Sequence, residues 1–236
     1  MPQAPVPDPV ADCTLRDRAL LVDGVLVVAD LHLGQGAASQ LDFPVGDTTR
    51  TVDALEALLE RTDPEHLVLA GDTLHSFSTV PTTVADALET IVAAATDRGV
   101  EAIALQGNHD AMLEAVWQGE VRDSYRVGDT VICHGHEAPT ERGERYVIGH
   151  EHPVLSVAGR RRPCYLVGES GFEGGDLVVL PAFGRLLRGV VVNEMRADEF
   201  MSPLVTDADG LAPVVWDEDA RETLDFPPLG EFRERL

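Results

Sequence analysis

The most informative segment of the sequence is an apolar run that ends in polar residues, Val25-Leu26-Val27-Val28-Ala29-Asp30-Leu31-His32. Its apolar run is long enough for a buried strand, and the run ends at a carboxylate and an imidazole. A second apolar run, Ala19–Val22, precedes it and is joined to it by Asp23-Gly24, a dipeptide that favours a tight hairpin turn. We therefore expect a hairpin whose second strand is buried and carries polar side chains at its end.

Two later segments repeat this pattern of a strand followed by polar residues. The expected strand His66–Ala70 leads into Gly71-Asp72-Thr73-Leu74-His75, and the expected strand Glu101–Gln106 leads into Gly107-Asn108-His109-Asp110. Between the strands, apolar residues recur with helical spacing, at Val52, Leu55, Leu58 and Leu59, and again at Val84, Leu88, Ile91, Val92 and Ala95. Alternating strands and helices predict a layered α/β arrangement, in which ligands bind beyond the carboxyl ends of the strands.

The second half of the chain has a different rhythm and is rich in short strands. They are expected at residues 130–133, 146–148, 154–157, 165–167, 177–180 and 190–192. Two more polar islands lie here, His134-Gly135-His136 and Gly149-His150-Glu151-His152. Only His66 of the eight histidines lies outside the five islands, and we expect it to be a structural residue. The predicted organisation is a flexible tail over residues 1–15, one domain over 16–216 and a peripheral acidic tail over 217–236.

The composition is strongly acidic. The 236 residues include 41 Asp and Glu against 18 basic residues, all arginine, for a formal charge of −23. A hydrophobic content of 44% is enough for a real core and excludes disorder. The sequence has no apolar run long enough for a membrane span, no secretory signal and no metal-binding spacing of its three cysteines, so a cytoplasmic location is expected. Acidity normally disfavours a polyanionic partner.

The complete absence of lysine resembles the proteins of salt-accumulating haloarchaea. In molar salt the Debye length is about 3 Å, so charge repulsion between protein and substrate is largely screened. The acidity then describes the solvent of the protein and leaves phosphate chemistry open.

The five polar islands predict a metal site. Asp, Asn and His are donors that suit Mn²⁺, Fe²⁺ or Zn²⁺. In Asp30-x-His32 and His150-x-His152, an extended backbone would place both side chains on one face, where they could share one ion. A carboxylate such as Asp72 can bridge two cations that lie about 3.5–4 Å apart. Glycine precedes three of the islands and would bring the ligands close together.

In this order, the islands resemble the full motif set of calcineurin-like metallophosphoesterases, over residues 18–205. Two details, Ala29-Asp30-Leu31-His32-Leu33-Gly34 and the histidine at position 75, are similar to SbcD-type repair nucleases. The short chain resembles the small SbcD-related archaeal and bacterial group. The resemblance implies an α/β (α+β) fold, a four-layer αββα sandwich with mixed β-sheets.

The resemblance also implies two divalent metal ions, Mn²⁺ first, with Fe²⁺, Zn²⁺ or Ni²⁺ as alternatives. One ion would take Asp30, His32, Asp72 and His152, and the other would take Asp72, Asn108, His134 and His150. A hydroxide that bridges them would attack phosphorus. His109 would stabilise the developing charge or protonate the leaving oxygen, and His75 would orient His109 or contact the scissile phosphate.

Three function classes stay open. A phosphodiesterase or nuclease on DNA or RNA is favoured by His75 and the SbcD-like motif. The alternatives are a phosphatase or phosphodiesterase of small nucleotides and a metal-binding scaffold without turnover, although a scaffold has no need of His109. The short stretch after His152 leaves no room for a capping domain, so we expect an open site that could accept a single strand. The resemblance further implies a helicase or another DNA-repair partner, and no membrane.

Several residues beside the ligands have two interpretations. Asp110 and His136 are candidates for supporting the ligands, while His136 and Glu137 could instead be solvent-facing turn residues. The only basic run, Arg160-Arg161-Arg162, could contact a nucleic-acid backbone or form a hairpin tip that balances nearby acids. Residues 141–200 hold eight arginines against nine acids, so the acidic surplus lies elsewhere.

Overall fold

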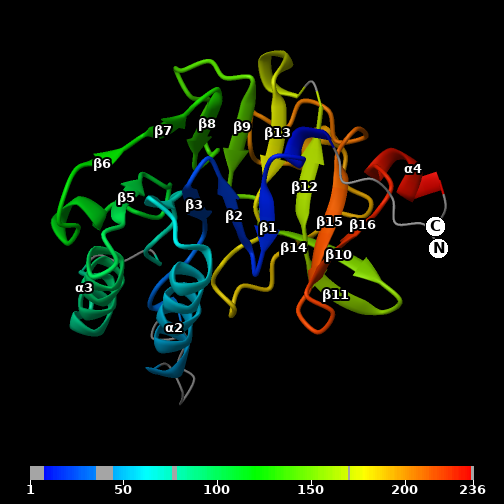
Figure 1. Cartoon of the computed structure of the whole chain (residues 1–236). Coiled ribbons are helices and arrows are strands. Elements are labelled where there is room, and N and C mark those ends of the chain that lie inside the picture. Colours follow the sequence, from blue (N-terminus) through cyan, green and yellow to red (C-terminus); the bar gives the residue numbers. More distant parts are fainter. Residues whose placement is uncertain (1–7, 36–44, 76–78, 170, 235–236) are drawn as a thin grey trace.

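The first layer of the molecule is a six-stranded sheet. The computed structural model describes residues 8–35, 45–75, 79–169 and 171–234 (Figure 1). The strands follow in sequence order across the sheet: β1 (Thr14–Arg16), β2 (Ala19–Val22), β3 (Val25–Val28), β4 (His66–Leu69), β5 (Glu101–Leu105) and β6 (Val121–Arg122). The first three pair antiparallel and the last four pair parallel, which confirms the predicted β2–β3 hairpin. The carboxyl ends of β3, β4 and β5 therefore meet at one edge.

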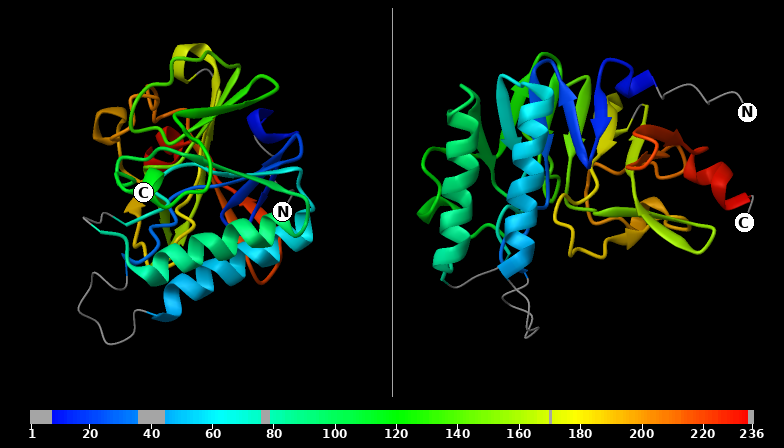
Figure 2. Two further views of the ribbon diagram at one scale, coloured as in Figure 1. Left: turned by 90° about the vertical axis from the view of Figure 1, so that its left-hand side faces the viewer. Right: turned by 60° about the horizontal axis from the view of Figure 1, so that its bottom comes forward.

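Two helices cover one face of this sheet, α2 (Val45–Thr62) and α3 (Thr82–Thr96). Figure 2 shows them side by side on that face. The leucines and valines of the helical spacing are buried against alternate residues of the strands, with Leu55, Leu88 and Leu67 each no more than 1% exposed. After α3 the chain turns at Gly99, whose φ of +74° is the left-handed conformation that glycine adopts without strain.

The second large sheet has seven strands, in the order β16-β15-β12-β13-β9-β8-β7. Their bounds are β7 (Ser124–Val127), β8 (Thr130–Cys133), β9 (Arg145–Ile148), β12 (Tyr165–Gly168), β13 (Asp176–Val179), β15 (Ala212–Asp217) and β16 (Glu222–Asp225). A small third sheet joins β11 (Arg160–Pro163), β10 (Pro153–Val157) and β14 (Val190–Val191). The neighbouring strands β8, β9 and β13 run parallel, so the carboxyl ends of β8 and β9 also lie at a common edge.

The core lies between the two large sheets. Alternate residues of both sheets meet there, among them Val27 and Val68 from the first and Val147 and Tyr165 from the second. The hydroxyl of Tyr165 donates a hydrogen bond to the carbonyl oxygen of Ala19 at 2.8 Å and so links the sheets. This mixed α/β sandwich confirms the predicted fold class. The predicted sandwich has a helical layer on the outer face of the second sheet. In the structure this face is covered instead by irregular segments, short 3₁₀ turns and the six-residue helix α4 (Leu229–Glu234).

Both predicted tails are more ordered than expected. In the part of residues 1–15 that the structure describes, β1 begins at Thr14, and the Val10 side chain is 1% exposed in the core; residues 1–7 lie outside the described part. The acidic run after residue 216 is the turn between β15 and β16, where Asp217 accepts hydrogen bonds from the next residues, and Leu229 of α4 is fully buried. Apolar side chains within both segments explain why they pack. None of the described helices has the length and apolar content to cross a bilayer.

Candidate metal centre

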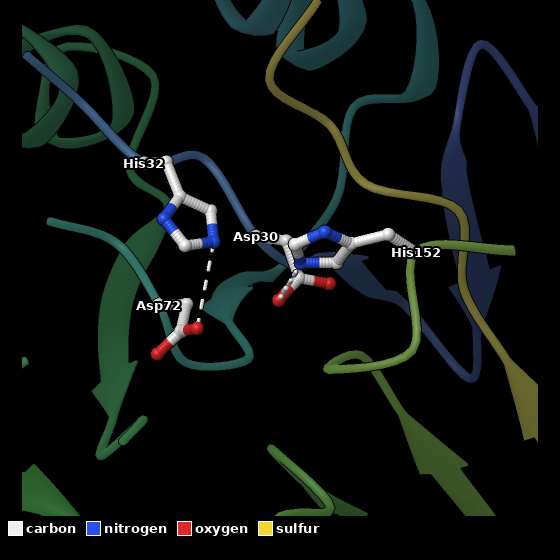
Figure 3. Close-up of side chains that lie close together, drawn as sticks. All are labelled: Asp30, His32, Asp72 and His152. Carbon is white, nitrogen blue, oxygen red and sulfur yellow. Dashed lines mark ion pairs between the residues drawn. The ribbon is translucent and has the colours of Figure 1, made fainter. Parts of the chain in front are cut away.

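Donor side chains from both large sheets meet at the edge where β3, β4, β8 and β9 end. Two groups form there, each with its donor atoms within 4.8 Å of one another. The first group is Asp30, His32, Asp72 and His152, drawn in Figure 3. The second group is Asp72, His134 and His150. Asp72 belongs to both, as the resemblance implied.

Asn108 completes the second group. Its side-chain oxygen lies 3.0 Å from Nε2 of His134, and the same nitrogen lies 3.4 Å from Oδ1 of Asp72. The other ring nitrogen of His134, Nδ1, lies 3.2 Å from the carbonyl oxygen of Ala70. A hydrogen bond from Nδ1 to this carbonyl leaves the Nε2 lone pair facing the group, which is the usual arrangement of a metal-binding histidine.

The first group is held by close carboxylate–imidazole contacts. Nε2 of His152 lies 3.1 Å from Oδ1 of Asp30, and Nε2 of His32 lies 3.4 Å from Oδ2 of Asp72 (Figure 3). Asp30 and Asp72 are at most 2% exposed. Among the described residues, no arginine forms an ion pair with either carboxylate.

The backbone at the centre is unusual. Five of the seven candidate ligands have positive φ: Asp30 (56°), His32 (44°), Asp72 (47°), His150 (68°) and His152 (47°). Left-handed conformations cost free energy in residues that carry a Cβ, and they persist where the surrounding structure requires them, often at functional sites. They also correct one expectation, because neither Asp30-x-His32 nor His150-x-His152 has the extended backbone expected of it. Asp30 and His32 nevertheless belong to the same group, whereas His150 and His152 belong to different groups.

The glycines act as the sequence predicted. Gly71 has φ +80°, and a Cβ there would lie 2.6 Å from the ring of His134. A Cβ on Gly107 would lie 2.3 Å from Oδ1 of Asp72, and one on Gly149 would lie 2.7 Å from Oδ2 of Asp30. Side chains at these three positions would therefore occupy the space of the donor groups themselves.

Burial and hydrogen bonding set the protonation of the centre. Burial alone would raise the pKa of Asp72, but His134, the backbone N–H of His109 and the ring of His32 hold its pKa below the ordinary value. Burial lowers the pKa of His32 to about 4, which outweighs the nearby Asp72 and Asp30. Burial, followed by the neighbouring His134, also lowers the pKa of His150 to about 4. Burial would also lower the pKa of His134 and His152, but their contacts with Asp72 and Asp30 outweigh it and raise the pKa of both rings. The Asp72 carboxylate is therefore ionised and the rings of His32 and His150 are neutral, which are the forms that bind metal ions.

A cation pair fits these residues. Asp30 and Asp72 are two buried carboxylates whose close ionisable partners are all histidines, so a cation would compensate their charge. Within the described chain, both ring nitrogens of His32 and Nε2 of His152 are buried and make no hydrogen bond of good geometry, although carboxylate oxygens lie 3.4 Å from His32 and 3.1 Å from His152. Oxygen and imidazole donors together suit a divalent ion of intermediate hardness.

His109 and His75 lie beside the first group. The ring of His109 is 5.2 Å from that of His32, and its Nε2 is 4.0 Å from Oδ2 of Asp72. The rings of His75 and His109 are nearly parallel, with centroids 6.4 Å apart. The side chain of His109 is 39% exposed, so it borders the centre and faces solvent.

Asp110 supports the loops that carry the donors. This carboxylate is 1% exposed and accepts hydrogen bonds from the backbone N–H groups of Thr73, Leu74 and Gly107, at 3.2, 2.8 and 3.1 Å. Burial raises the pKa of Asp110 to about 6. It therefore joins the loop after β4 to the loop after β5.

Three other sequence candidates lie outside the two groups. The half-buried ring of His136 is 5.3 Å from that of His134, while Glu137 is exposed. His66 lies at the start of β4, with Nδ1 3.6 Å from Glu101, away from the centre.

The basic run forms β11 and is not part of the centre. The Arg161 guanidinium donates hydrogen bonds to the carbonyl oxygens of Arg188 and Gly189, at 3.1 and 2.9 Å. Arg162 pairs with Asp217 at 3.2 Å, and Arg160 is exposed. Two of the three arginines therefore have contacts within the chain, which favours a hairpin over a nucleic-acid contact for this run. Contact of Arg160 with phosphate stays a prediction.

Sequence reasoning missed Glu151, which lies between the two last histidines. It is 2% exposed and accepts a hydrogen bond from the backbone N–H of Ser202 at 2.5 Å. This contact holds the segment around Ser202 beneath His150 and His152. In the sequence, the only feature that pointed to Glu151 was its position between the two candidate ligands His150 and His152.

Comparison with known proteins agrees with this geometry. Residues 24–136 match the family model of the calcineurin-like phosphoesterases. The chain is similar to the crystal structure of Pseudomonas putida nuclease MPE, with 22% identity and a TM-score of 0.61 over 91% of this chain and 94% of that one. It is less similar to YfcE, a phosphoesterase from E. coli, with 15% identity and a TM-score of 0.42 over 84% and 95% of the two chains. No curated protein matches the sequence. Residues 24–136 are thus similar in sequence to calcineurin-like phosphoesterases, and the chain has the metallophosphoesterase sandwich fold.

Proposed function

We propose that the protein is a metal-dependent phosphodiesterase that cleaves DNA or RNA strands. One observation supports this above all: two donor groups share the buried carboxylate of Asp72, and His109 stands beside them at the solvent boundary. Phosphodiester hydrolysis needs positive charge opposite the phosphoryl oxygens, an activated water and a proton for the leaving oxygen. The centre has a candidate group for each requirement.

The residues that would hold two divalent cations are those of the two groups. Asp30, His32, Asp72 and His152 would hold one, and Asp72, Asn108, His134 and His150 would hold the other. A cation pair supplies an activated water nucleophile and neutralises phosphoryl charge. The protein fixes the donor positions through left-handed backbone at the strand ends and through Asp110.

His109 is the candidate proton donor. Its ring borders the first group without belonging to either donor set, so an imidazole proton remains available to the leaving oxygen. The ring of His75 is nearly parallel to that of His109 and lies 5.9 Å from the ring of His32, where it can restrict the orientation of His109 or contact the phosphate. The loop of His75 is fixed because its backbone N–H donates to the carbonyl oxygen of Leu33 at 3.1 Å.

A nucleic-acid substrate is favoured over a small monoester by what surrounds the centre. Among the described residues no separate domain covers this edge of the sheets, so an extended chain can reach it (Figure 1). The P. putida protein is a nuclease, and 91% of this chain aligns with 94% of it.

The test compares three substrates with Mn²⁺ in molar KCl: bis-p-nitrophenyl phosphate, p-nitrophenyl phosphate and labelled single-stranded DNA. We expect turnover of both diesters and loss of turnover with EDTA. Turnover of the monoester alone would overturn the nuclease proposal and favour a phosphatase. Absence of all three activities in protein that binds two Mn²⁺ would favour a scaffold.

A further inference from the structure

A cavity of about 240 Å³ adjoins the metal centre on the side of the second donor group. Three segments form it: Gln106 after β5, Asp123 and Ser124 at the start of β7, and residues 133–140 after β8. The cavity therefore lies where the ends of the two large sheets meet. Of the residues that the proposed function assigns to metal binding or catalysis, only His134 lines this cavity.

His136 connects the cavity to the centre. Its ring lies 5.3 Å from the ring of His134 and 6.2 Å from that of His150. Among the described residues, the buried Nδ1 of His136 has no hydrogen-bond partner. The ring of His136 is tilted by 50° and 60° against these two rings, so it does not stack on them, and a half-buried imidazole that lines a cavity is a surface on which a planar group can stack.

The polar groups of the wall are mainly acceptors. Asp123 and Glu137 contribute carboxylates. The side-chain amide of Gln106 donates to the carbonyl oxygen of Gly107 at 3.0 Å, which leaves its own oxygen as an acceptor. The hydroxyl of Ser124 is directed to Glu141, to which it donates at 2.9 Å. This lining repels phosphate and matches a neutral, flat group that carries N–H donors.

We propose that this cavity receives the nucleobase next to the scissile phosphate and prefers a base with an exocyclic amino group. The inference rests on the proposed phosphodiesterase function and names a base-recognition site within it. Carboxylates accept hydrogen bonds from the amino group of cytosine, and side-chain amides pair with adenine. At position 4, uracil has a carbonyl oxygen in place of the cytosine amino group, and this oxygen is an acceptor that cannot donate a hydrogen bond to the carboxylates.

The position of the cavity also orders the strand across the centre. His109 lies against His32 in the first donor group, whereas His136 lies against His134 and His150 of the second. The nucleotide whose base occupies the cavity is therefore on the side away from His109. If His109 protonates the leaving oxygen, this nucleotide keeps the phosphate.

The test uses a pair of labelled single strands, oligo-deoxycytidine and oligo-deoxyuridine, whose bases differ in the amino or carbonyl group at position 4 and in the proton that uracil carries on N3. The full chain with Mn²⁺ in molar KCl should cleave the cytosine strand with a kcat/KM about tenfold higher, the size of one good base contact. In Asp123→Asn and His136→Ala, this ratio should fall toward one. Glu120→Gln removes an exposed charge three residues from Asp123 and outside the cavity, and should keep the wild-type ratio.

Each outcome has a distinct meaning. Equal cleavage of the two strands by the wild type, or an unchanged ratio in both cavity variants whose thermal unfolding matches the wild type, would overturn the base site. Hydrolysis of bis-p-nitrophenyl phosphate without cleavage of either strand would also overturn it, while the phosphodiesterase chemistry would stand. Loss of all diester turnover in the wild type is instead the failure of the proposed function.

Discussion

The backbone N–H of His109 donates a hydrogen bond to Oδ1 of Asp72 at 2.8 Å. The carboxylate shared by both donor groups therefore also fixes the loop that carries the candidate proton donor. The same residue's imidazole approaches the other carboxylate oxygen, Oδ2, at 4.0 Å. If the proposed function is right, metal binding and proton delivery both depend on this one side chain.

Replacement of His109 by alanine should separate metal binding from turnover. The backbone hydrogen bond to Asp72 does not need the imidazole, so two metal ions should remain bound. Turnover of diesters should fall by about 10²–10⁴-fold, the usual contribution of a general acid. Metal content and kcat are measured on the same preparation. His66→Ala, at a histidine outside the centre, is the matched control. Near-normal turnover in His109→Ala would remove this residue from the mechanism.

Asp110→Asn should destabilise the protein although it preserves size. The carboxylate accepts three backbone N–H groups, and an amide offers only one acceptor oxygen. A buried N–H left without an acceptor costs about 1–3 kcal/mol, so the free energy of unfolding should fall by about that amount. Urea denaturation measures it. The control Asp86→Asn, on the exposed face of α3, should leave the free energy of unfolding nearly unchanged. Equal stability of the two variants would show that the hydrogen bonds to Asp110 contribute little.

The hydrogen bond between the two sheets gives a simpler stability test. Tyr165→Phe removes a fully buried hydroxyl and leaves the carbonyl oxygen of Ala19 without this donor. We expect a loss of about 1 kcal/mol in the free energy of unfolding. Chemical denaturation of the variant and the wild type is sufficient, and an unchanged midpoint would contradict the assignment.

The net charge of −23 predicts a dependence of stability on salt. Repulsion among surface carboxylates opposes folding in dilute buffer, and KCl screens it. We expect Tm to rise between 0.1 M and 2 M KCl, by about 4–8 °C if screening contributes about 2 kcal/mol. Differential scanning calorimetry gives the value. Full stability in dilute buffer would argue against adaptation to high salt.

Much of the centre follows from sequence because each donor directly follows a recognisable strand. Asp30, Asp72 and Asn108 come after apolar runs that could only be buried, and parallel strands bring such ends together. The left-handed backbone at Asp30 and His152 could not be predicted, since it depends on hydrogen bonds to distant segments. The backbone N–H of Asp30 donates to the carbonyl oxygen of Gly71, and the carbonyl oxygen of His152 accepts from the N–H of Val190. For the same reason, the extended backbone expected for Asp30-x-His32 and His150-x-His152 was wrong.

Other differences come from contacts between distant segments. The acidic run at Asp217 was predicted to be a tail, but the carboxylate of Asp217 accepts hydrogen bonds within a hairpin turn and pairs with Arg162. The cavity beside His136 depends on Asp123 and Gln106, which no local pattern connects to it. Sequence periodicity predicts which side chains are buried, but it does not predict which distant segments come into contact.

The most direct test of the account is anomalous diffraction from crystals grown with Mn²⁺. We predict two Mn²⁺ peaks, both within coordinating distance of Asp72, one also bound by Asp30, His32 and His152 and the other by Asn108, His134 and His150. A separation of about 3.5–4 Å is expected for a catalytic pair. A single peak, or two peaks that do not share Asp72, would contradict the central claim.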